Sequence, residues 1–316
     1  MITITLPQQA LITQVEADQL VLALLGDRMT ASSISSFVSS RAAALAFAGL
    51  SGGSPLSDNG KAGYRGVNAG DFGVQRGVWV NASGSFIDDD RPGSSQDGFG
   101  GSGAIGADLI FDTGFIGLFA GYGSTELDGA LVDYSSRGWT GGAYASWSAS
   151  PLFRVTGTVG VGNHDVEFGR RAGALRSYGE TDREQVFGSI GFQSQLDVGS
   201  GWVVVPSLGL LATTSDTDGY VDSGGLPIGS VSSDMTIVQA GGALFYTASA
   251  WLPYVSASFN SQTDDTPGVD GDYALLGGGF SAPLSDDLTL GVNVQTLVGK
   301  KNERETSFGA TLRKSF

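Results

Sequence analysis

The only histidine of the chain, His164, is followed directly by Asp165, and such a pair could serve a hydrolase as a general base with its orienting acid. A histidine base of this kind needs a serine nucleophile close by, or further acids in a fixed arrangement. The local run Asn163-His164-Asp165-Val166 supplies neither. We therefore interpret His164 as a solvated loop residue and predict no catalytic residue. A hydrolase working through His164 is kept as an alternative.

A second run, Gly101-Ser102-Gly103-Ala104-Ile105-Gly106, has the GxGxxG spacing of a dinucleotide-binding loop. That loop must follow a strand and open a helix, so that backbone N–H groups face the pyrophosphate. Here an alternating strand continues straight through the run, and its glycines are interpreted as small positions on one face. No nucleotide or other cofactor is predicted.

Acidic residues dominate the charge of the chain, with 32 Asp and Glu against 17 Lys and Arg and a formal net charge of −15. This balance argues against nucleic-acid binding, because phosphate contacts need clustered Lys and Arg. With no cysteine and one histidine, thiolate and multi-histidine metal sites are excluded. The acids form clusters that we interpret as solvated, since their spacing does not match a calcium loop, and no metal is predicted. These clusters are Asp88, Asp89 and Asp90; Asp216 and Asp218; and Asp264 and Asp265.

From about residue 72 onward the hydrophobic pattern has a period of two, which predicts strands rather than helices. In the run 105–112, for example, Ile105, Leu109 and Phe111 share one face, whereas Asp108 lies on the other. The pattern predicts twelve strands, near 72–86, 100–112, 114–124, 135–149, 151–163, 183–197, 201–213, 234–249, 251–261, 272–283, 287–299 and 304–316.

The connections between these strands alternate in length. The odd-numbered ones are predicted to be long acidic loops, including IDDDRPGSSQDGF, ELDGALVDY and the stretch 164–182. The even-numbered ones are short, such as Asp112-Thr113-Gly114 and Ser150-Pro151. A meander with short turns at one end and long loops at the other is typical of an outer-membrane barrel. A soluble sandwich with Greek-key crossings has no reason to sort its loops in this way.

The two faces of the predicted strands differ in chemistry. One is Leu, Val, Ile, Phe and Ala with Trp and Tyr near several strand ends, which suits hydrocarbon bordered by interfacial aromatics. Every backbone N–H group in lipid needs a partner, so the first strand must pair with the twelfth. We predict an all-β fold, a 12-stranded antiparallel transmembrane up-and-down β-barrel, whose lumen is lined by Gly, Ser, Thr, Asn and Gln. The isolated charges predicted to face this lumen are Asp108, Arg154, Arg183, Glu305 and Arg313.

Residues 1–50 differ from the rest and form a predicted helical segment, joined by a flexible linker, 51–71, to the barrel of residues 72–316. The second helix, 30–48, is rich in Ser and Ala and is therefore thin for an α-helix, which is normally about 10–12 Å wide. We predict that it lies inside the pore as a plug; packing on the periplasmic rim or binding a partner are the alternatives. The predicted plug residues are Ser33, Phe37, Arg41 and Leu45.

The stretch from about residue 72 to 316 resembles the translocator barrel of bacterial autotransporters, the type V secretion family. The resemblance is carried by GVWVNASGSF (77–86), by GADLIFDTGFIGLFAGYGST (106–125), and by the C-terminal strand ending in Phe316. The preceding helix and linker complete the pattern. In this family twelve strands close around a helix that joins a secreted passenger to the barrel. The resemblance covers about three-quarters of the chain.

This resemblance implies a non-enzymatic protein of the bacterial outer membrane that holds an exported segment through its pore. Long loops would be extracellular, and short turns and the C-terminus periplasmic. Implied partners are outer-membrane lipid and lipopolysaccharide, the barrel-insertion machinery, and a passenger or surface partner bound through residues 1–50. The implied insertion signal is Phe308, Leu312 and Phe316, although Lys314 stands where such signals usually have an aromatic residue. A porin-like channel or structural surface protein is the alternative function.

No signal peptide is visible in the first residues, MITITLPQQA. For an exported chain we therefore expect the targeting segment upstream of Met1 or already removed. The longest apolar run, 20–25, is too short to cross a bilayer as a helix. A passenger, likewise, is expected upstream of residue 1, or the barrel is itself the product.

Overall fold

Antiparallel strands make up nearly all of the computed structural model, which describes residues 74–90, 95–111, 113–129, 131–150, 152–172, 175–249, 251–264 and 271–316. No helix in these residues is long and apolar enough to cross a bilayer. In chain order the strands are β1 (Gln75–Asp89), β2 (Gln96–Phe111), β3 (Gly114–Gly129), β4 (Val132–Ser150), β5 (Phe153–Ala172), β6 (Leu175–Ser194), β7 (Leu196–Gly199), β8 (Trp202–Thr217), β9 (Tyr220–Val221), β10 (Pro227–Ile228), β11 (Val231–Tyr246), β12 (Leu252–Asp264), β13 (Asp272–Pro283), β14 (Leu288–Val298) and β15 (Glu303–Ser315).

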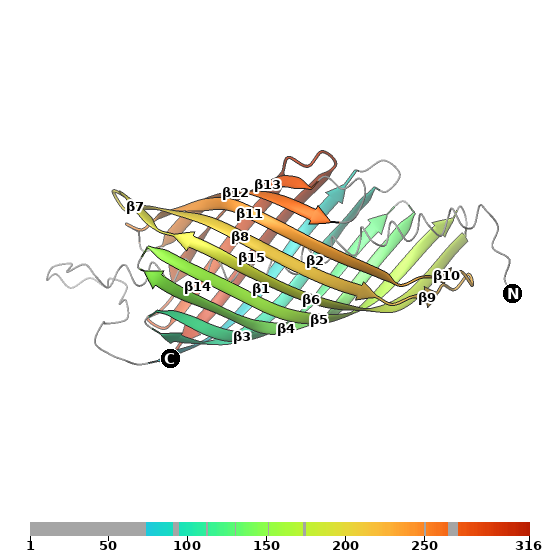
Figure 1. Ribbon diagram of the computed structural model, residues 1–316, viewed down its shortest axis with the longest axis horizontal. Helices are drawn as coiled ribbons and strands as arrows, with labels where there is room; N and C mark the ends of the chain where they lie inside the picture. The colour runs from blue at the N-terminus through green and yellow to red at the C-terminus, as the bar shows by residue number, and fades with distance from the viewer. Residues whose placement is uncertain are drawn as a thin grey trace.

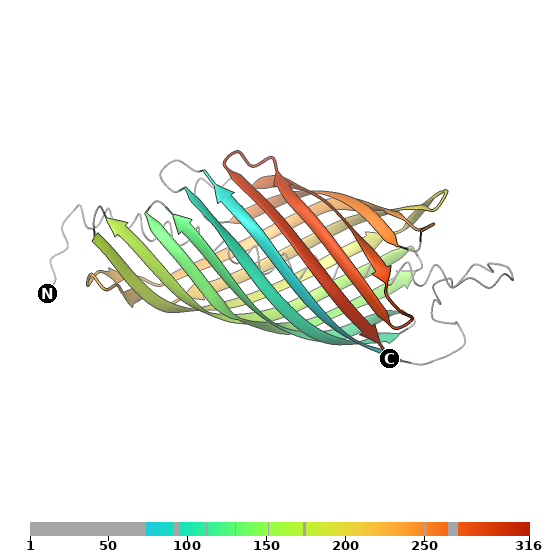
Figure 2. The same ribbon diagram turned by 180° about the vertical axis from the view of Figure 1, so that it is seen from behind.

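The sheet closes because its last strand pairs with its first. Residues 77–89 of β1 run antiparallel to residues 303–315 of β15 without a break in register, and β8 pairs with β11 on the far side. The short β7 continues β6 beyond Gln195 and also pairs with β8, and β9 and β10 form a separate small ladder. With β6 and β7 taken as one strand, the described residues form a barrel of twelve strands. Figure 2 shows the first and last strands, β1 and β15, side by side at the seam. The prediction of a closed twelve-stranded antiparallel barrel is confirmed.

The strands are strongly tilted, and the two ends of the barrel differ (Figure 1). We call the end that carries the C-terminal Phe316 and the β13–β14 connection the turn end. The opposite end, which carries the small β9–β10 ladder, is the hairpin end. The short connections, such as β2–β3 and β13–β14, lie at the turn end. Strand β1 therefore starts at the turn end at Gln75 and finishes at the hairpin end at Asp89.

A band of apolar side chains covers the outer face of the barrel towards the turn end. Val78 and Val80 of β1, for example, are about half exposed, and so are many equivalent aliphatic residues around the sheet. Trp139 and Trp147 of β4 are exposed and eight residues apart, which is about 26 Å of strand, or roughly 20 Å of height at a 40° tilt. That height is near the roughly 25 Å apolar band of outer-membrane barrels with its aromatic borders.

Towards the hairpin end the two faces exchange character. Tyr134 of β4 and Phe168 of β5 are buried on the inner side, whereas Asp128, Asp165 and Glu167 are exposed on the outer side. The inner residues join one apolar cluster, the upper cluster, which consists of Ile87, Leu127, Val132, Tyr134, Val166 and Phe168 with Tyr220 packed against it. This part of the wall therefore follows the pattern of a soluble barrel, polar outside and apolar inside.

The upper cluster explains where the predicted loops were wrong. The stretch 164–182 is almost entirely strand, because β5 continues to Ala172 and β6 begins at Leu175. ELDGALVDY is likewise mostly strand, with β3 ending at Gly129 and β4 beginning at Val132. Charged residues alternating with single apolar residues looked like loop, but the apolar residues are buried inside the wall and hold the strands together.

The β8–β11 connection folds back onto the wall instead of standing free. Its Ser223 exchanges hydrogen bonds with Tyr178, whose carbonyl accepts from the Ser223 N–H at 2.8 Å and whose N–H donates to Ser223 Oγ at 2.9 Å. Tyr220 stacks on Phe168 with ring centroids 5.8 Å apart and an angle of 5°. Asp222 forms an ion pair with Arg170. The connection thereby covers the part of β6 that reaches beyond β8, where the strand edge would otherwise be open.

Candidate functional site: the barrel lumen

An ion pair crosses strand β1 on the inner face at the turn end. Arg313 of β15 and Asp108 of β2 are 3.2 Å apart, and the strand between them carries Gly77 at that level. A Cβ atom on Gly77 would lie 2.4 Å from Arg313 Nη2 and 2.7 Å from Asp108 Oδ1. Glycine is therefore required for the pair to form over β1. The pair ties the last strand to the second, across the seam.

Aromatic side chains extend this ion pair into a network. Tyr144 of β4 donates its hydroxyl hydrogen to Asp108 Oδ2 at 3.1 Å, and Trp79 of β1 donates from Nε1 to the Tyr144 hydroxyl at 2.6 Å. The Asp108 side chain has no exposed surface. A carboxylate so far from solvent is stabilised only by such donors, so the network holds its charge in place.

An aromatic and aliphatic belt continues from this network around the inner wall. Its members are Trp79, Phe115, Phe119, Tyr144, Phe187, Leu211, Met235 and Ile237. Four of its rings lie opposite a glycine of the neighbouring strand: Trp79 faces Gly106, Tyr144 faces Gly117, Phe119 faces Gly142 and Phe187 faces Gly160. A Cβ atom at any of these glycines would lie 2.3 to 2.7 Å from a ring atom. The rings therefore lie flat along the wall, which leaves the middle of the lumen for something else.

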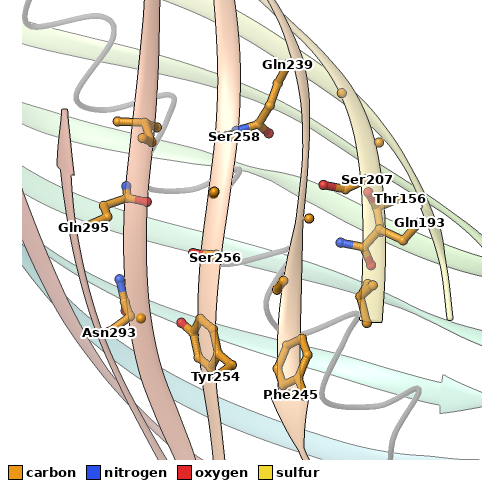
Figure 3. Close-up of a pocket in the computed structure, with 18 of the residues that line it drawn as sticks. Thr156, Gln193, Ser207, Gln239, Phe245, Tyr254, Ser256, Ser258, Asn293 and Gln295 are labelled. Atoms are coloured by element: carbon orange, nitrogen blue, oxygen red, sulfur yellow. Dashed lines mark hydrogen bonds between the residues drawn. The ribbon is translucent and has the colours of Figure 1, made fainter. Parts of the chain in front are cut away.

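A cavity of about 320 Å³ lies inside the barrel against β5, β6, β8 and β11 to β15. Figure 3 shows amide and hydroxyl side chains pointing into it, among them Gln193, Gln239, Asn293 and Gln295. Phe245 and Tyr254 lie at its lower edge in this view. Arg313 also lines the cavity, so it adjoins the ion pair described above. Amides and hydroxyls both donate and accept hydrogen bonds, so this wall suits a polar uncharged guest such as a peptide surface.

The remaining charges predicted to face the lumen also make contacts with inner-wall hydroxyl groups. Arg183 donates to the Tyr134 hydroxyl at 3.2 Å and to Ser215 Oγ at 3.3 Å. Arg154 donates from Nε to Ser148 Oγ at 3.0 Å, and Glu305 accepts a hydrogen bond from Ser85 Oγ at 3.2 Å. The described structure brings Asp108 and Arg313 together but keeps Arg154, Arg183 and Glu305 in separate contacts.

The other predicted site residues fall in two places. Ser33, Phe37, Arg41 and Leu45, the predicted plug residues, lie outside the described residues. Phe308, Leu312 and Phe316 of the last strand are on the outer face, with Phe316 the most exposed of the three. Phe308 packs with Phe86 and Phe99 of β1 and β2, with ring centroids 6.0 and 6.4 Å away, so the seam is sealed on its outer side as well.

His164 lies in β5 rather than in a loop, which corrects the interpretation of it as a solvated loop residue. It is half-buried and pairs in register with Gly138 of β4 and Arg183 of β6. The Gly101–Gly106 run lies entirely within β2, with no helix after it. No group of three His, Cys, Asp or Glu residues that could hold a metal ion occurs among the described residues.

Lys314, the residue that departs from the usual insertion signal, has partners at the turn end. Its Nζ lies 3.5 Å from Asp287 Oδ2 and 5.4 Å from the centroid of the Phe316 ring. Ser285 Oγ donates to Asp287 Oδ1 at 2.6 Å. The hydrogen bond from Ser285 and, after it, the charge of Lys314 lower the pKa of the Asp287 carboxyl below its ordinary value of 3.8.

Asp287 should therefore stabilise the turn only while it is ionised. Because the pKa is lower in the folded state, its contribution is complete above the ordinary carboxyl pKa and is lost as the pH falls through the folded value. Asp287→Ala is expected to lower the melting temperature slightly at neutral pH, and this difference should vanish on acidification below pH 3.8. Melting curves of wild type and variant at several pH values test this, with Asp286→Ala as the control in the same turn. A difference that grows on acidification would contradict it.

Sequence reasoning missed the inner aromatic belt and one buried acid. Trp79 and Tyr144 were visible on the inner parity, but their glycine partners are recognisable only once the register between strands is known. Asp89 was interpreted as part of a solvated cluster, yet it is wholly buried on the inner face of β1. Asp89 ends an alternating run and shares the parity of Trp79 and Ile87, and this pattern could have indicated that it faces inward.

Known proteins share this architecture. The family model "Autotransporter beta-domain" matches residues 78–295, more than half of the chain. The beta domain of the autotransporter BrkA from Bordetella matches at 17% identity and a TM-score of 0.66, over 77% of this chain and 100% of that one. The translocator domain of NalP from Neisseria meningitidis matches at 14% identity and a TM-score of 0.69, over 90% and 98%. No curated protein sequence matches the chain.

A third solved structure, the transport unit of the autotransporter AIDA-I from Escherichia coli, matches at 13% identity and a TM-score of 0.63, over 88% of this chain and 98% of that one. At these identities the likeness of the structures concerns the fold, whereas the family model concerns the sequence of the barrel itself. The closed twelve-stranded sheet and the matched residues agree on the same assignment. The chain belongs to the autotransporter beta-domain family and is a translocator barrel of the bacterial outer membrane.

Proposed function

We propose that this barrel anchors an exported segment of its own chain, held through the lumen by residues 30–48. The observation that supports this most directly is the two-sided inner wall, with flat aromatic rings on one side and an amide-lined cavity on the other. A helix of Ser and Ala punctuated by larger residues presents both kinds of surface. Ser33, Phe37, Arg41 and Leu45 are spaced four residues apart, so they would lie along one side of such a helix and bring polar and apolar groups to the same part of the wall.

The orientation proposed here places the hairpin end outside the cell and the turn end in the periplasm. The acidic outer surface near the hairpin end, with Asp128, Asp165 and Glu167 exposed, would then face the lipopolysaccharide region. Phe308, Leu312 and Phe316 would be accessible to the barrel-insertion machinery before the last strand closes the seam. Residues 1–50 would carry a passenger or meet a surface partner, and the barrel itself would be no enzyme.

Deleting residues 30–48 is expected to raise the single-channel conductance of the barrel in planar bilayers at least several-fold. The physical reason is that a helix about 10–12 Å wide would fill most of a lumen of this size, and its removal leaves a water-filled path. Deleting residues 1–15 is the matched control, because it shortens the same segment without touching the proposed plug. An unchanged conductance after the 30–48 deletion would contradict the proposal.

The same recordings address the alternative function as a small-solute channel. The amide-lined cavity is the observation in its favour, because such a wall also accepts small polar solutes. A channel predicts that the full chain conducts steadily and that the deletion changes little. The translocator function predicts a low conductance for the full chain.

A further inference from the structure

Two basic side chains lie next to each other on the outer face of the barrel at the turn end. Arg76 belongs to β1 and Lys314 to β15, the two strands that meet at the seam. Lys314 is in register with Val78, and the Phe316 N–H group donates to the Arg76 carbonyl at 2.9 Å, so the two basic residues are diagonal neighbours. Diagonal neighbours on one face of a sheet are about 7–8 Å apart, which is within reach of long side chains.

Both residues lie at the edge of the apolar outer band. The exposed residues on the membrane side of the pair are all apolar: Val78, Val80, Ala82 and Phe86 on β1, and Leu312, Ala310 and Phe308 on β15. Each strand therefore changes from lipid-facing residues to a cation at the same edge of the band. Lipid headgroups begin where the hydrocarbon-facing residues end, so the two cations lie at headgroup level.

The pair concentrates the positive charge of this part of the surface. Among the residues that the structure describes, Arg76 and Lys314 are the only basic side chains on the outer face at the turn end, because Arg154 and Arg313 face the lumen. Three outer arginines at the hairpin end are instead paired with acids of neighbouring strands: Arg137 with Glu167, Arg171 with Asp133, and Arg304 with Asp88. A chain with a formal charge of −15 thus places two cations side by side at one point of its membrane border.

The wall leaves part of this positive charge available to a ligand. Arg76 is exposed and forms no ion pair with any of the described residues. Lys314 and Asp287 are each about half exposed, and 3.5 Å separates Nζ from Oδ2. Exposed ion pairs of this kind contribute little to stability, so a better-placed anion can replace Asp287 at the Lys314 ammonium.

We propose that Arg76 and Lys314 bind the phosphate of an anionic phospholipid, whose acyl chains lie on the apolar outer face of the seam. A guanidinium donates to phosphate oxygens as a planar fork, and an ammonium adds a second point charge. The anion is a lipid rather than a soluble phosphate, because the site adjoins the apolar band, where an amphipathic anion also buries its tail. The choice of a phospholipid over lipopolysaccharide rests on the proposed orientation, in which the turn end faces the periplasm.

Native mass spectrometry of the full chain in a neutral detergent tests the site by counting bound lipids during titration with phosphatidylglycerol or phosphatidylcholine of the same acyl chains. Phosphatidylglycerol is expected to bind about tenfold more tightly, because no cation in its own headgroup cancels its charge. Arg76→Gln and Lys314→Gln should each weaken its binding about fivefold, the usual effect of one basic residue near an anionic surface. The double variant should bind both lipids nearly alike. Asp287→Asn removes the competing acid and should tighten the binding of phosphatidylglycerol about twofold.

Arg304→Gln is the matched control, because it removes an exposed cation from the outer face of the same strand at the hairpin end, and it should leave lipid binding unchanged. Lys314→Arg keeps the charge and should retain the affinity. Equal binding of the two lipids by the wild type, or an equal loss of binding in Arg304→Gln and Lys314→Gln, would overturn the proposal.

Two competitors identify the source of the phosphate. Glycerol 3-phosphate at the concentration of the lipid should not displace phosphatidylglycerol; displacement would overturn the assignment to a lipid. Lipid A, the phosphorylated anchor of lipopolysaccharide, should bind less tightly than phosphatidylglycerol. Tighter binding of lipid A would overturn the choice of a phospholipid and with it the proposed orientation. The lumen takes no part in these titrations, so their outcome is independent of the conductance test of the proposed function.

Discussion

Replacing Asp108 with alanine is expected to lower the free energy of unfolding of the barrel by about 3–5 kcal/mol, the usual result of removing one partner of a buried ion pair. The variant leaves the Arg313 guanidinium, which is 14% exposed, without its carboxylate, and the Tyr144 hydroxyl without its acceptor. Both groups remain enclosed by the wall, so water replaces the lost contacts poorly. Urea unfolding in lipid vesicles, followed by tryptophan fluorescence, measures the change.

The matched control is Asp97→Ala on the same strand. Asp97 is exposed, and substitutions at such surface positions usually change stability by no more than about 0.5 kcal/mol. A double variant, Asp108→Leu with Arg313→Met, should recover much of the loss, because it removes both charges together. Equal effects of Asp108→Ala and Asp97→Ala would show that the pair across Gly77 contributes nothing to the closed barrel.

Replacing Gly160 with alanine is expected to destabilise the barrel by about 1–3 kcal/mol, the usual range for adding a methyl group to a filled site. Its Cβ would lie 2.4 Å from Cζ of Phe187, whose ring covers that glycine from the neighbouring strand. The ring cannot move outward through the wall, so it must turn into the lumen or push β5 and β6 apart. The same unfolding measurement in vesicles applies.

Gly157→Ala, three residues earlier on the same strand, is the control. The nearest heavy atom to a Cβ there is the Ser189 carbonyl oxygen at 3.7 Å, an ordinary contact. The loss in Gly160→Ala should also shrink when Phe187 is replaced by leucine, since the two residues share one contact. If Gly157→Ala and Gly160→Ala behave alike, the fit of ring to glycine is unimportant for stability.

The membrane-spanning part of this fold could be predicted from the sequence because each strand there alternates between outward apolar residues and inward small or polar residues. Ile105, Leu109 and Phe111 alternate with Gly106 and Asp108, so alternation alone assigns the first three to the outer face and the other two to the inner face. The ladder of hydrogen bonds then demands closure, which is why the pairing of the first strand with the last followed without further information. The family resemblance rested on the same patterns.

Beyond the membrane the apolar residues face inward instead of outward, and the prediction of loops there was wrong. Val166 and Phe168 have the spacing of a strand, but the charged Glu167 lies between them and charged residues flank them, so such a short alternating stretch is ambiguous between loop and strand. Only the packing of six apolar residues from β1, β3, β4 and β5 against one another makes these stretches strand. Asp89 was mispredicted for the same reason: it lies in the acidic run Asp88-Asp89-Asp90, which resembles a loop in sequence, but its side chain is buried in the structure.

By itself the sequence determined that the barrel is closed and that its apolar parity faces outward in the membrane band. Those properties follow from local alternation and from the cost of an unpaired backbone group in lipid, both of which are written residue by residue. The tertiary structure decided which ring lies on which glycine, that Arg313 reaches Asp108 over Gly77, and that Arg76 and Lys314 are neighbours at the seam. These depend on the register between strands far apart in the chain, which no single strand specifies.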